Sequence, residues 1–380
     1  MHLAQMIDTL DWGGAQKMQL FLVQALVPLG IDVTVISLNQ SLDSPLPAQL
    51  KAAGARVMIF PFPRLLSLQS FLRLAAFMRR EKFDLLHAYL AYGNIIGSLV
   101  GRLSSTPVFG SFRNAGYDPQ RMTARRIKLE TFCLQHFTQG IIANGYAVAE
   151  YGRKQVGNSI PIDILPNAID ANAKPSLSNA ERRTLRQQIA SDPDRTIILS
   201  VGRLTPQKGF PNLLRAYASV LQAHPNTALV IAGGGISQGD LEEEIHRLGL
   251  DGHAFLLGQY NDVPRLLAVA DIYANSSIIE GTPVSLLEAM SAGLPIAATA
   301  VGDTPYILDN TSAILVPAEH PEELAEALSA LIASPERRCQ LGRAARERVE
   351  RNYSPKPWTR NLLQLYSKLA PQAADYLAKI

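Results

Sequence analysis

The chain has 380 residues and a net charge of +3, with 47% hydrophobic and 18% charged residues. This balance excludes an extensively disordered chain, and the length predicts two domains. No apolar run reaches the roughly 18 residues of a membrane-spanning helix, and the first ten residues lack signal-peptide features. Cys133 and Cys339 lie far apart without metal-ligand spacing, so we expect reduced thiols and a cytoplasmic protein.

Short apolar runs alternate with helical patterns through the first part of the chain. Residues 15–29 and 66–80, for example, have helical periodicity. Such alternation predicts a parallel sheet covered by helices on both faces. The predicted strands are 2–7, 31–38, 56–60, 84–87, 107–112, 140–143 and 163–165.

A polar, turn-rich stretch after Leu165 interrupts this alternation, which restarts at residue 196. The sequence therefore predicts an α/β protein of two doubly wound domains, whose ligands bind at the carboxyl ends of the strands. Helices are expected over 211–223, 240–248 and 283–292. The second set of predicted strands is 196–201, 228–232, 254–257, 272–275, 295–298 and 313–316. We divide the chain into a domain at 1–170, a linker region at 171–194, a domain at 195–355 and C-terminal helices at 356–380.

Positive charge is concentrated in the first domain. Residues 1–170 contain 16 Lys and Arg against 11 Asp and Glu, whereas the rest contains 20 against 22. One interpretation is a solvated helix surface, and the other is attraction to anionic lipid or to an anionic acceptor. Nucleic acid is disfavoured because no aromatic or Arg/Gly-rich motif accompanies the charge. The basic residues are Arg121, Arg125, Arg126 and Lys128, with a second group at Arg79, Arg80 and Lys82.

A glycine pair, Gly13-Gly14, follows the first predicted strand and precedes a helix. Glycine lets the backbone approach a ligand closely, and a helix N-terminus favours an anion. The pair alone also fits an ordinary turn. The G-x-G-x-x-G spacing is absent, which argues against an NAD-dependent dehydrogenase.

Two cations lie in the segment VGRLTPQKG, which follows the strand at 196–201. Arg203 and Lys208 are five residues apart and can together bind two phosphates of a diphosphate. Taken alone, the same two residues also fit an exposed loop.

The segment EGTPVSLLEAM at 280–290 predicts a helix start. We expect Thr282 to be the N-cap and Pro283 the first helical residue. The amides of Val284, Ser285 and Leu286 would then point outward at the positive end of the helix dipole. This arrangement predicts an anion site.

Two acids flank that predicted anion site. Glu280 precedes the helix, and Glu288 lies about one turn inside it. Carboxylates accept hydrogen bonds from hydroxyl pairs on a ribose or a sugar. Acids would repel a purely anionic ligand, so the combination indicates a phosphate-bearing sugar, although each acid alone also fits a capping or solvated role.

The motifs together resemble the retaining glycosyltransferases of the GT-B fold, family 4 (glycosyl transferases group 1). IDTLDWGGAQ, LPNAID, VGRLTPQKG, ALVIAGGG and the E-x7-E segment followed by SAGLP occur in the family's order and cover nearly the whole chain. The resemblance implies two facing Rossmann-like domains, an N-terminal acceptor domain and a C-terminal nucleotide-sugar donor domain. It also implies that a C-terminal helix returns toward the first domain.

The resemblance also implies roles for the matched residues. Arg203, Lys208 and Glu280 form the catalytic group: the two cations bind the donor diphosphate, and Glu280 holds the transferred sugar. Arg113 stands where some relatives have a histidine near the sugar, and is assigned as a sugar or acceptor contact. The donor-binding residues are Gly13, Gly14, Gln259, Gly281, Thr282, Val284, Ser285, Leu286 and Glu288.

Besides Arg113, two further departures from the family pattern stand out. Asn167-Ala168 replaces the common Asn-Gly, and His87-Ala88-Tyr89 replaces His-x-His. We interpret His87 and the remaining histidines as packing or solvent-facing residues.

The expected function is transfer of a sugar from a nucleotide-diphosphate sugar, with UDP favoured, to a hydroxyl of a glycan or lipid-linked acceptor in polysaccharide biosynthesis. Retention of the anomeric configuration is implied by the family. No cofactor and no metal ion is expected, because the cations and helix amides match the diphosphate charge and no D-x-D pair accompanies them. The expected location is the cytoplasm, with a peripheral contact at the inner face of the membrane as a further hypothesis. Two alternatives remain, a nucleotide-sugar 2-epimerase and a non-catalytic nucleotide-sugar-binding protein.

Overall fold

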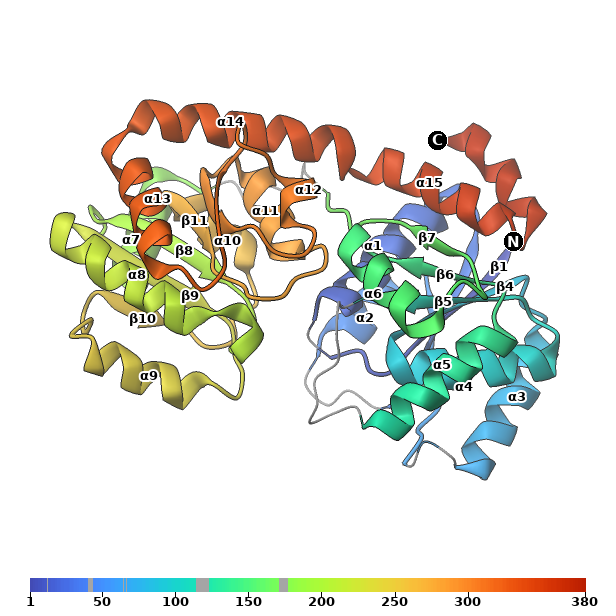
Figure 1. The fold of residues 1–380 in the computed structure, drawn as a ribbon. Helices are drawn as coiled ribbons and strands as arrows, with labels where there is room; N and C mark the ends of the chain where they lie inside the picture. The colour runs from blue at the N-terminus through green and yellow to red at the C-terminus, as the bar shows by residue number, and fades with distance from the viewer. Residues whose placement is uncertain (12, 40–43, 64, 66, 114–122, 171–176) are drawn as a thin grey trace. The chain divides into compact units, whose positions relative to one another are not determined.

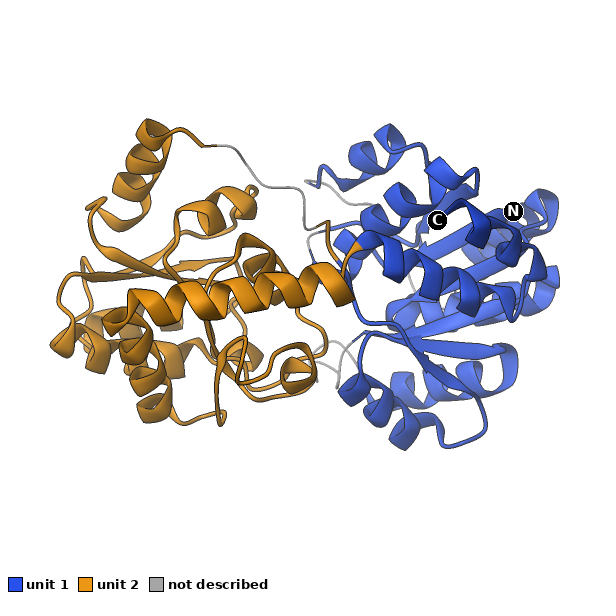
Figure 2. Cartoon of the chain, turned by 90° about the horizontal axis from the view of Figure 1, so that it is seen from above, with its two compact units in different colours: residues 1–168, 355–380 blue, residues 169–354 orange. Residues whose placement is uncertain are grey.

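The chain forms two compact units, Met1–Ala168 with Pro355–Ile380 and Ile169–Ser354, called unit 1 and unit 2 below (Figure 2). Each unit is described by itself. The computed structural model describes residues 1–11, 13–39, 44–63, 65, 67–113, 123–170 and 177–380 (Figure 1).

Unit 1 contains a seven-stranded parallel sheet in the order β3-β2-β1-β4-β5-β6-β7. Its strands are apolar runs that are largely buried, as expected for a sheet covered on both faces. The strands are β1 His2–Ile7, β2 Asp32–Ser37, β3 Arg56–Ile59, β4 Leu85–Tyr89, β5 Val108–Phe112, β6 Gly140–Ala143 and β7 Ile162–Ile164. The helices are α1 Gly14–Leu26, α2 Leu46–Ala52, α3 Leu68–Glu81, α4 Leu90–Ser104, α5 Ala124–Phe137, α6 Tyr146–Val156 and α15 Pro355–Ser367, with short 3-10 helices at Val27–Leu29 and Pro371–Lys379.

Helix α15 is part of the core of unit 1. The Trp358 indole N–H donates to the Pro166 carbonyl at 2.9 Å, and its ring meets Phe21 of α1 edge-on at 5.0 Å. Trp358, Leu362 and Tyr366 pack in one apolar cluster with α1 and β1. Helices α3 and α4 cover the opposite face through a second cluster.

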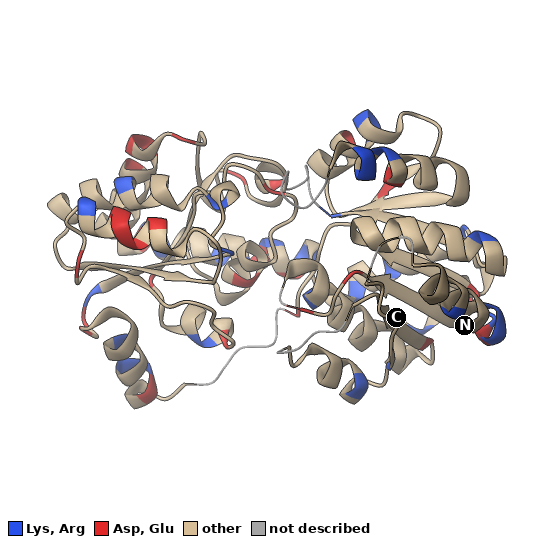
Figure 3. Cartoon of the chain, turned by 90° about the horizontal axis from the view of Figure 1, so that it is seen from below, with Lys and Arg blue, Asp and Glu red and all other residues tan. Residues whose placement is uncertain are grey.

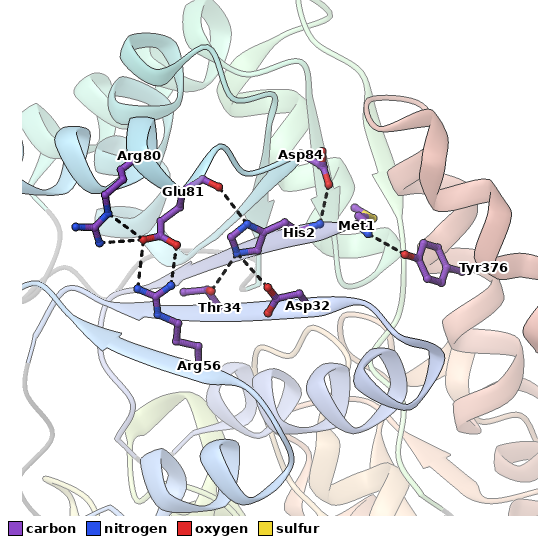
Figure 4. A network of polar contacts seen from close by, with 9 residues as sticks. All are labelled: Met1, His2, Asp32, Thr34, Arg56, Arg80, Glu81, Asp84 and Tyr376. Atoms are coloured by element: carbon purple, nitrogen blue, oxygen red, sulfur yellow. Dashed lines mark hydrogen bonds and ion pairs between the residues drawn. The ribbon is translucent and has the colours of Figure 1, made fainter.

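The amino ends of the unit 1 strands are joined by a polar network (Figure 4). Arg56 donates to Glu81 at 2.7 Å, and Arg80 donates to the same carboxylate at 2.9 Å. These two hydrogen bonds lower the pKa of Glu81 to about 2. The backbone N–H of His2 donates to Asp84 at 2.6 Å. Arg56, Arg80 and Glu81 therefore form one ion-paired group at this edge.

Unit 2 contains a six-stranded parallel sheet in the order β10-β9-β8-β11-β12-β13. None of these six strands holds a charged residue, and the charges lie on helices and loops (Figure 3). The strands are β8 Thr196–Val201, β9 Thr227–Ala232, β10 Ala254–Leu256, β11 Ile272–Asn275, β12 Ile296–Thr299 and β13 Ile314–Val316. The helices are η2 Pro206–Lys208, α7 Asn179–Ala190, α8 Phe210–Ala223, α9 Gln238–Arg247, α10 Val263–Val269, α11 Val284–Ala292, α12 Thr304–Ile307, α13 Pro321–Ala333 and α14 Pro335–Asn352.

The predicted fold class, two doubly wound parallel-sheet domains, is confirmed. In both units the strand order reverses beside the first strand, at β1/β4 and at β8/β11, and ligands of such folds bind at this point. Of the expected linker region 171–194, residues 171–176 lie outside the described part. The rest contains α7, which begins with a capping box between Ser178 and Glu181 and belongs to unit 2.

Candidate functional site

Two loops meet at the carboxyl edge of the unit 2 sheet, where β8 and β11 are neighbours. The Ser276 hydroxyl donates to the Lys208 carbonyl at 2.9 Å, and the Ile278 amide donates to the Gln207 carbonyl at 2.8 Å. Gly209 has a φ of 61°, and a Cβ there would lie 2.1 Å from the Ser276 carbonyl oxygen. Only glycine allows the loops to approach this closely.

This approach places two of the predicted catalytic side chains in contact. Lys208 Nζ lies 2.5 Å from Glu280 Oε1, which also accepts a hydrogen bond from the Ser277 hydroxyl at 2.6 Å. The Glu280 side chain is 8% exposed and that of Lys208 is 21% exposed. A charge this deeply buried needs a partner of opposite charge, and here the Lys208 ammonium and the Glu280 carboxylate are partners of each other.

Arg203 follows β8 in an anchored loop. Leu204 is fully buried, its amide donates to the Gly234 carbonyl at 3.0 Å, and its carbonyl accepts from the Ser237 amide at 3.0 Å. The Arg203 side chain is exposed and makes no hydrogen bond or ion pair with any residue that the structure describes. The backbone is thus fixed while the guanidinium remains accessible.

Helix α11 begins one residue later than predicted. The N-cap is Pro283, with an extended ψ of 119°, and the first helical residue is Val284. Thr282 is buried instead, and its hydroxyl donates to Asp303 at 3.3 Å. The predicted cap at Thr282 is therefore wrong, because a tertiary contact takes the hydroxyl that would have capped the helix.

The set of outward amides changes accordingly. The Leu286 amide donates to the Pro283 carbonyl at 3.2 Å, so the prediction that it points outward unpaired is wrong. Val284 and Ser285 form the first turn of α11, and Gly281 lies in the loop before it. The helix N-terminus still lies at the carboxyl edge of the sheet, directly after the loop that contains Glu280.

Glu288 lies on the second turn of α11. Both acids affect the buried hydroxyl of Tyr273 on β11: burial raises the pKa of Tyr273, and the charges of Glu288 and Glu280 raise it further. Gln259 is exposed after β10, beside Gly234, whose carbonyl holds the Arg203 loop. The structure therefore brings the predicted donor-binding residues of unit 2 to one edge of its sheet.

At the carboxyl edge of the unit 1 sheet, α1 begins at Gly14, and Gly13 is its extended N-cap. The sequence analysis missed Asp8, whose carboxylate accepts from the Gly93 amide at 2.6 Å and from the Tyr92 amide at 3.4 Å. Burial raises the pKa of Asp8 to about 7 despite these hydrogen bonds. The sequence signal that could have identified Asp8 is its position directly after the first predicted strand.

Arg113 follows β5 and lies over the ring of Tyr89, with 4.4 Å between its Cζ and the ring centroid. Beneath them is a buried polar cluster that the sequence analysis also missed. His87 Nδ1 is 2.7 Å from the Tyr366 hydroxyl and 3.1 Å from that of Tyr89, and His87 Nε2 is 2.7 Å from the Ser111 hydroxyl. Burial, together with the charge of Arg113, lowers the pKa of His87 well below its ordinary value, so the imidazole is neutral.

Arg125 and Lys128 of the predicted basic group are exposed on α5, whereas Arg126 is half-buried against Tyr92, and Arg121 lies outside the described residues. Within the described ranges there is no group of three or more His, Cys, Asp or Glu side chains arranged to hold a metal ion. No described helix is both long enough and apolar enough to cross a bilayer.

Comparison with known proteins agrees with these two units. Residues 12–173 match the family Glycosyltransferase Family 4, and residues 181–348 match Glycosyl transferases group 1. Together the two matches include nearly all of the residues assigned to the candidate site.

Two curated relatives and one solved structure illustrate the similarity. A GDP-mannose-dependent monoacylated alpha-(1-6)-phosphatidylinositol monomannoside mannosyltransferase of Corynebacterium glutamicum is 26% identical over 62% of this chain and 61% of its own length. A UDP-Gal:alpha-D-GlcNAc-diphosphoundecaprenol alpha-1,3-galactosyltransferase of Escherichia coli is 24% identical over 64% of each chain. The chain thus spans less than two thirds of either relative. The structure of Anabaena Alr3699/HepE in complex with UDP-glucose superposes over 100% of both chains with a TM-score of 0.82 at 19% identity.

Proposed function

The chain belongs to glycosyltransferase family 4, with the GT-B fold, and on that premise we propose that it transfers a sugar from a nucleotide-diphosphate sugar to a hydroxyl of an acceptor. The observation that carries this proposal is the contact between Lys208 and Glu280 beside the start of α11. A cation and a carboxylate at one helix N-terminus match a ligand with both phosphates and hydroxyls.

The proposed mechanism follows from these positions. The barrier to cleaving the anomeric bond lies in the charge that develops on the departing diphosphate. Arg203 and Lys208, with the first amides of α11, stabilise that charge once the donor is bound. Glu280 holds the hydroxyls of the transferred sugar, and Glu288 holds those of the ribose. Binding of the diphosphate would draw Lys208 toward a phosphate and leave Glu280 available to the sugar.

We propose a UDP-sugar as the donor and a glycan or lipid-linked acceptor. The UDP and UDP-glucose complexes of the structural neighbour support UDP as the nucleotide of the donor, although the C. glutamicum relative is named as GDP-mannose-dependent. The names of both relatives include a lipid-linked, phosphate-containing acceptor, which supports that acceptor class. Retention of configuration is proposed from the family alone.

The test is a thermal-shift panel of nucleotide sugars, followed by product analysis of the best ligand. A true donor raises the midpoint of unfolding by mass action. The product distinguishes the three hypotheses: a transferred sugar supports this proposal, a 2-epimer supports the epimerase, and an unchanged ligand supports a binding protein.

We also propose that no metal ion takes part, because the donor's charge is met by Arg203, Lys208 and helix amides. Turnover should survive EDTA unchanged. Complete loss with EDTA, restored by Mg²⁺ or Mn²⁺, would contradict this assignment of charge.

A further inference from the structure

Arg113 is a buried cation for which the described part of the chain supplies no counter-ion. The side chain is 9% exposed, and its Nε atom is buried without a hydrogen-bond partner. Among the described residues no carboxylate lies within ion-pair distance of the guanidinium, and its recorded contact is with the face of the Tyr89 ring. A buried charge in this state is costly, so proteins rarely retain one without a use for it.

Arg186 in unit 2 shows how this chain treats an arginine that is held for structural reasons. Its side chain is 15% exposed, and Nη2 lies 3.1 Å from Asp271. It also donates to the carbonyl oxygens of Pro193, Val269 and Arg195. Arg56 at the amino edge of unit 1 is likewise paired with Glu81 (Figure 4). Arg113 has no equivalent acceptor among the described residues.

The groups around Arg113 position it without neutralising it. His87 is neutral, and burial raises the pKa of both Tyr89 and Tyr366, so these hydroxyls stay protonated. Hydrogen bonds between the two ring nitrogens of His87 and the hydroxyls of Tyr366 and Ser111 fix the cluster on which the Tyr89 ring rests. The guanidinium is therefore held over the Tyr89 ring, and none of the described groups around it carries a negative charge.

We infer that Arg113 binds an oxyanion, a phosphate or a carboxylate, carried by the acceptor. The planar guanidinium can donate two parallel hydrogen bonds to such a group, and its contact with the face of the Tyr89 ring holds it in place. The assignment to the acceptor rests on the proposed function, because the donor's diphosphate is already matched by Arg203 and Lys208 in unit 2. Arg113 would thus select anionic acceptors.

The first test measures binding of inorganic phosphate to the full chain by calorimetry. The background variant Arg203→Gln/Lys208→Gln removes the unit 2 cations. Adding Arg113→Met to it should weaken phosphate binding at least tenfold, whereas Arg102→Met, at an exposed position on α4 of the same unit, should not. Phosphate binding that is unaffected by Arg113→Met, or already absent in the background variant, would overturn the inference.

The second test separates a binding role from a structural one. Without added anion, Arg113→Met should leave the midpoint of thermal unfolding unchanged or raise it, because an unpartnered buried charge is removed. Phosphate should then raise the midpoint of the wild type more than that of the variant. A clear fall in the midpoint of the variant would mean that Arg113 supports the core, which contradicts the inference.

A third set of titrations identifies the source of the oxyanion. Acetate and phosphate distinguish a carboxylate from a phosphate group, and Arg113-dependent binding of neither would contradict the inference. If saturating UDP displaces phosphate from the Arg113-dependent site in the chain with Arg203 and Lys208 intact, the oxyanion belongs to the donor and the acceptor assignment is wrong. Arg113-dependent phosphate binding without any sugar transfer would instead contradict the proposed function and leave the oxyanion site in place.

Discussion

The carboxyl edges of the two sheets share a topology and differ in how their charges are matched. In each unit the loops after two adjacent central strands meet where the strand order reverses. In unit 2 these loops bring Lys208 to within 2.5 Å of Glu280. In unit 1 the carboxylate of Asp8 is bound by backbone amides, and the cation Arg113 lies over a neutral ring.

This difference separates the contribution of the shared topology from the contribution of the side chains. The topology determines where ligand-facing loops meet, whereas the side chains determine what charge those loops accept. At the unit 2 edge Lys208 is paired with Glu280 and Arg203 remains accessible, which suits a ligand with both phosphates and hydroxyls. At the unit 1 edge Arg113 and Asp8 form no ion pair with each other, and the edge suits a ligand that brings its own anion.

The largest expected effect tests whether the unit 2 cations act on the leaving diphosphate. Replacing Lys208 or Arg203 with Gln should lower kcat by about 10²–10³-fold, as for loss of one preorganised charge donor. Steady-state kinetics with the donor measures this loss. Arg337→Gln, at an exposed position on α14 of the same unit, is the matched control. Wild-type turnover in both site variants would contradict the proposed role of Lys208 and Arg203 in stabilising the leaving diphosphate.

Substitution of the two acids at the unit 2 edge, Glu280 and Glu288, should affect different kinetic constants. Glu280→Gln should lower kcat by about 10²-fold, because a strong charged contact to the reacting sugar is lost. Its affinity for free nucleoside diphosphate should be unchanged or higher, since Lys208 loses its competing partner. Glu288→Gln should instead raise KM and weaken nucleoside diphosphate binding, because the ribose changes little during reaction. Calorimetry and steady-state kinetics report both quantities, and the opposite pattern would reverse the placement of the two acids.

A smaller effect concerns the exposed cations of unit 1. If α5 faces an anionic membrane, Arg125→Gln/Lys128→Gln should weaken binding to phosphatidylglycerol vesicles by about tenfold or more, and added salt should weaken binding by the wild type. The matched control is the double variant Arg153→Gln/Lys154→Gln, which removes two exposed cations from α6 of the same unit. Equal vesicle binding by wild type and the α5 variant would favour the solvated-surface interpretation.

The smallest effect concerns Asp8. Its pKa in the folded protein is about 7, against an ordinary value of 3.8. Between these values the folded state binds the proton more tightly than the unfolded state, so the free energy of unfolding contributed by Asp8 falls as pH rises and levels off above about pH 7. Asp8→Asn keeps an acceptor for the Gly93 amide but cannot ionise. Calorimetry from about pH 4 to about pH 8 should show that the midpoint of thermal unfolding of the variant is a few degrees above that of the wild type at the alkaline end. At the acid end the two midpoints should be equal. Identical pH profiles would contradict the raised pKa.

The sequence by itself determined the strands and the order of the ligand loops. The predicted strands at 2–7, 140–143, 196–201 and 272–275 have the same limits as β1, β6, β8 and β11. These are local properties, since apolar runs of this length flanked by glycine and polar turns fold as buried strands. The resemblance likewise depended on motifs that are each local.

Only the tertiary structure decided the capping of α11 and the charge environment of unit 1. Thr282 can cap a helix, but its hydroxyl is taken by Asp303, 21 residues away in the chain. His87 meets Tyr366 across 279 residues because α15 packs into unit 1. Arg113 appears in the sequence as one arginine among many. Its burial without a carboxylate follows from packing between residues distant in the chain, which local sequence patterns do not encode.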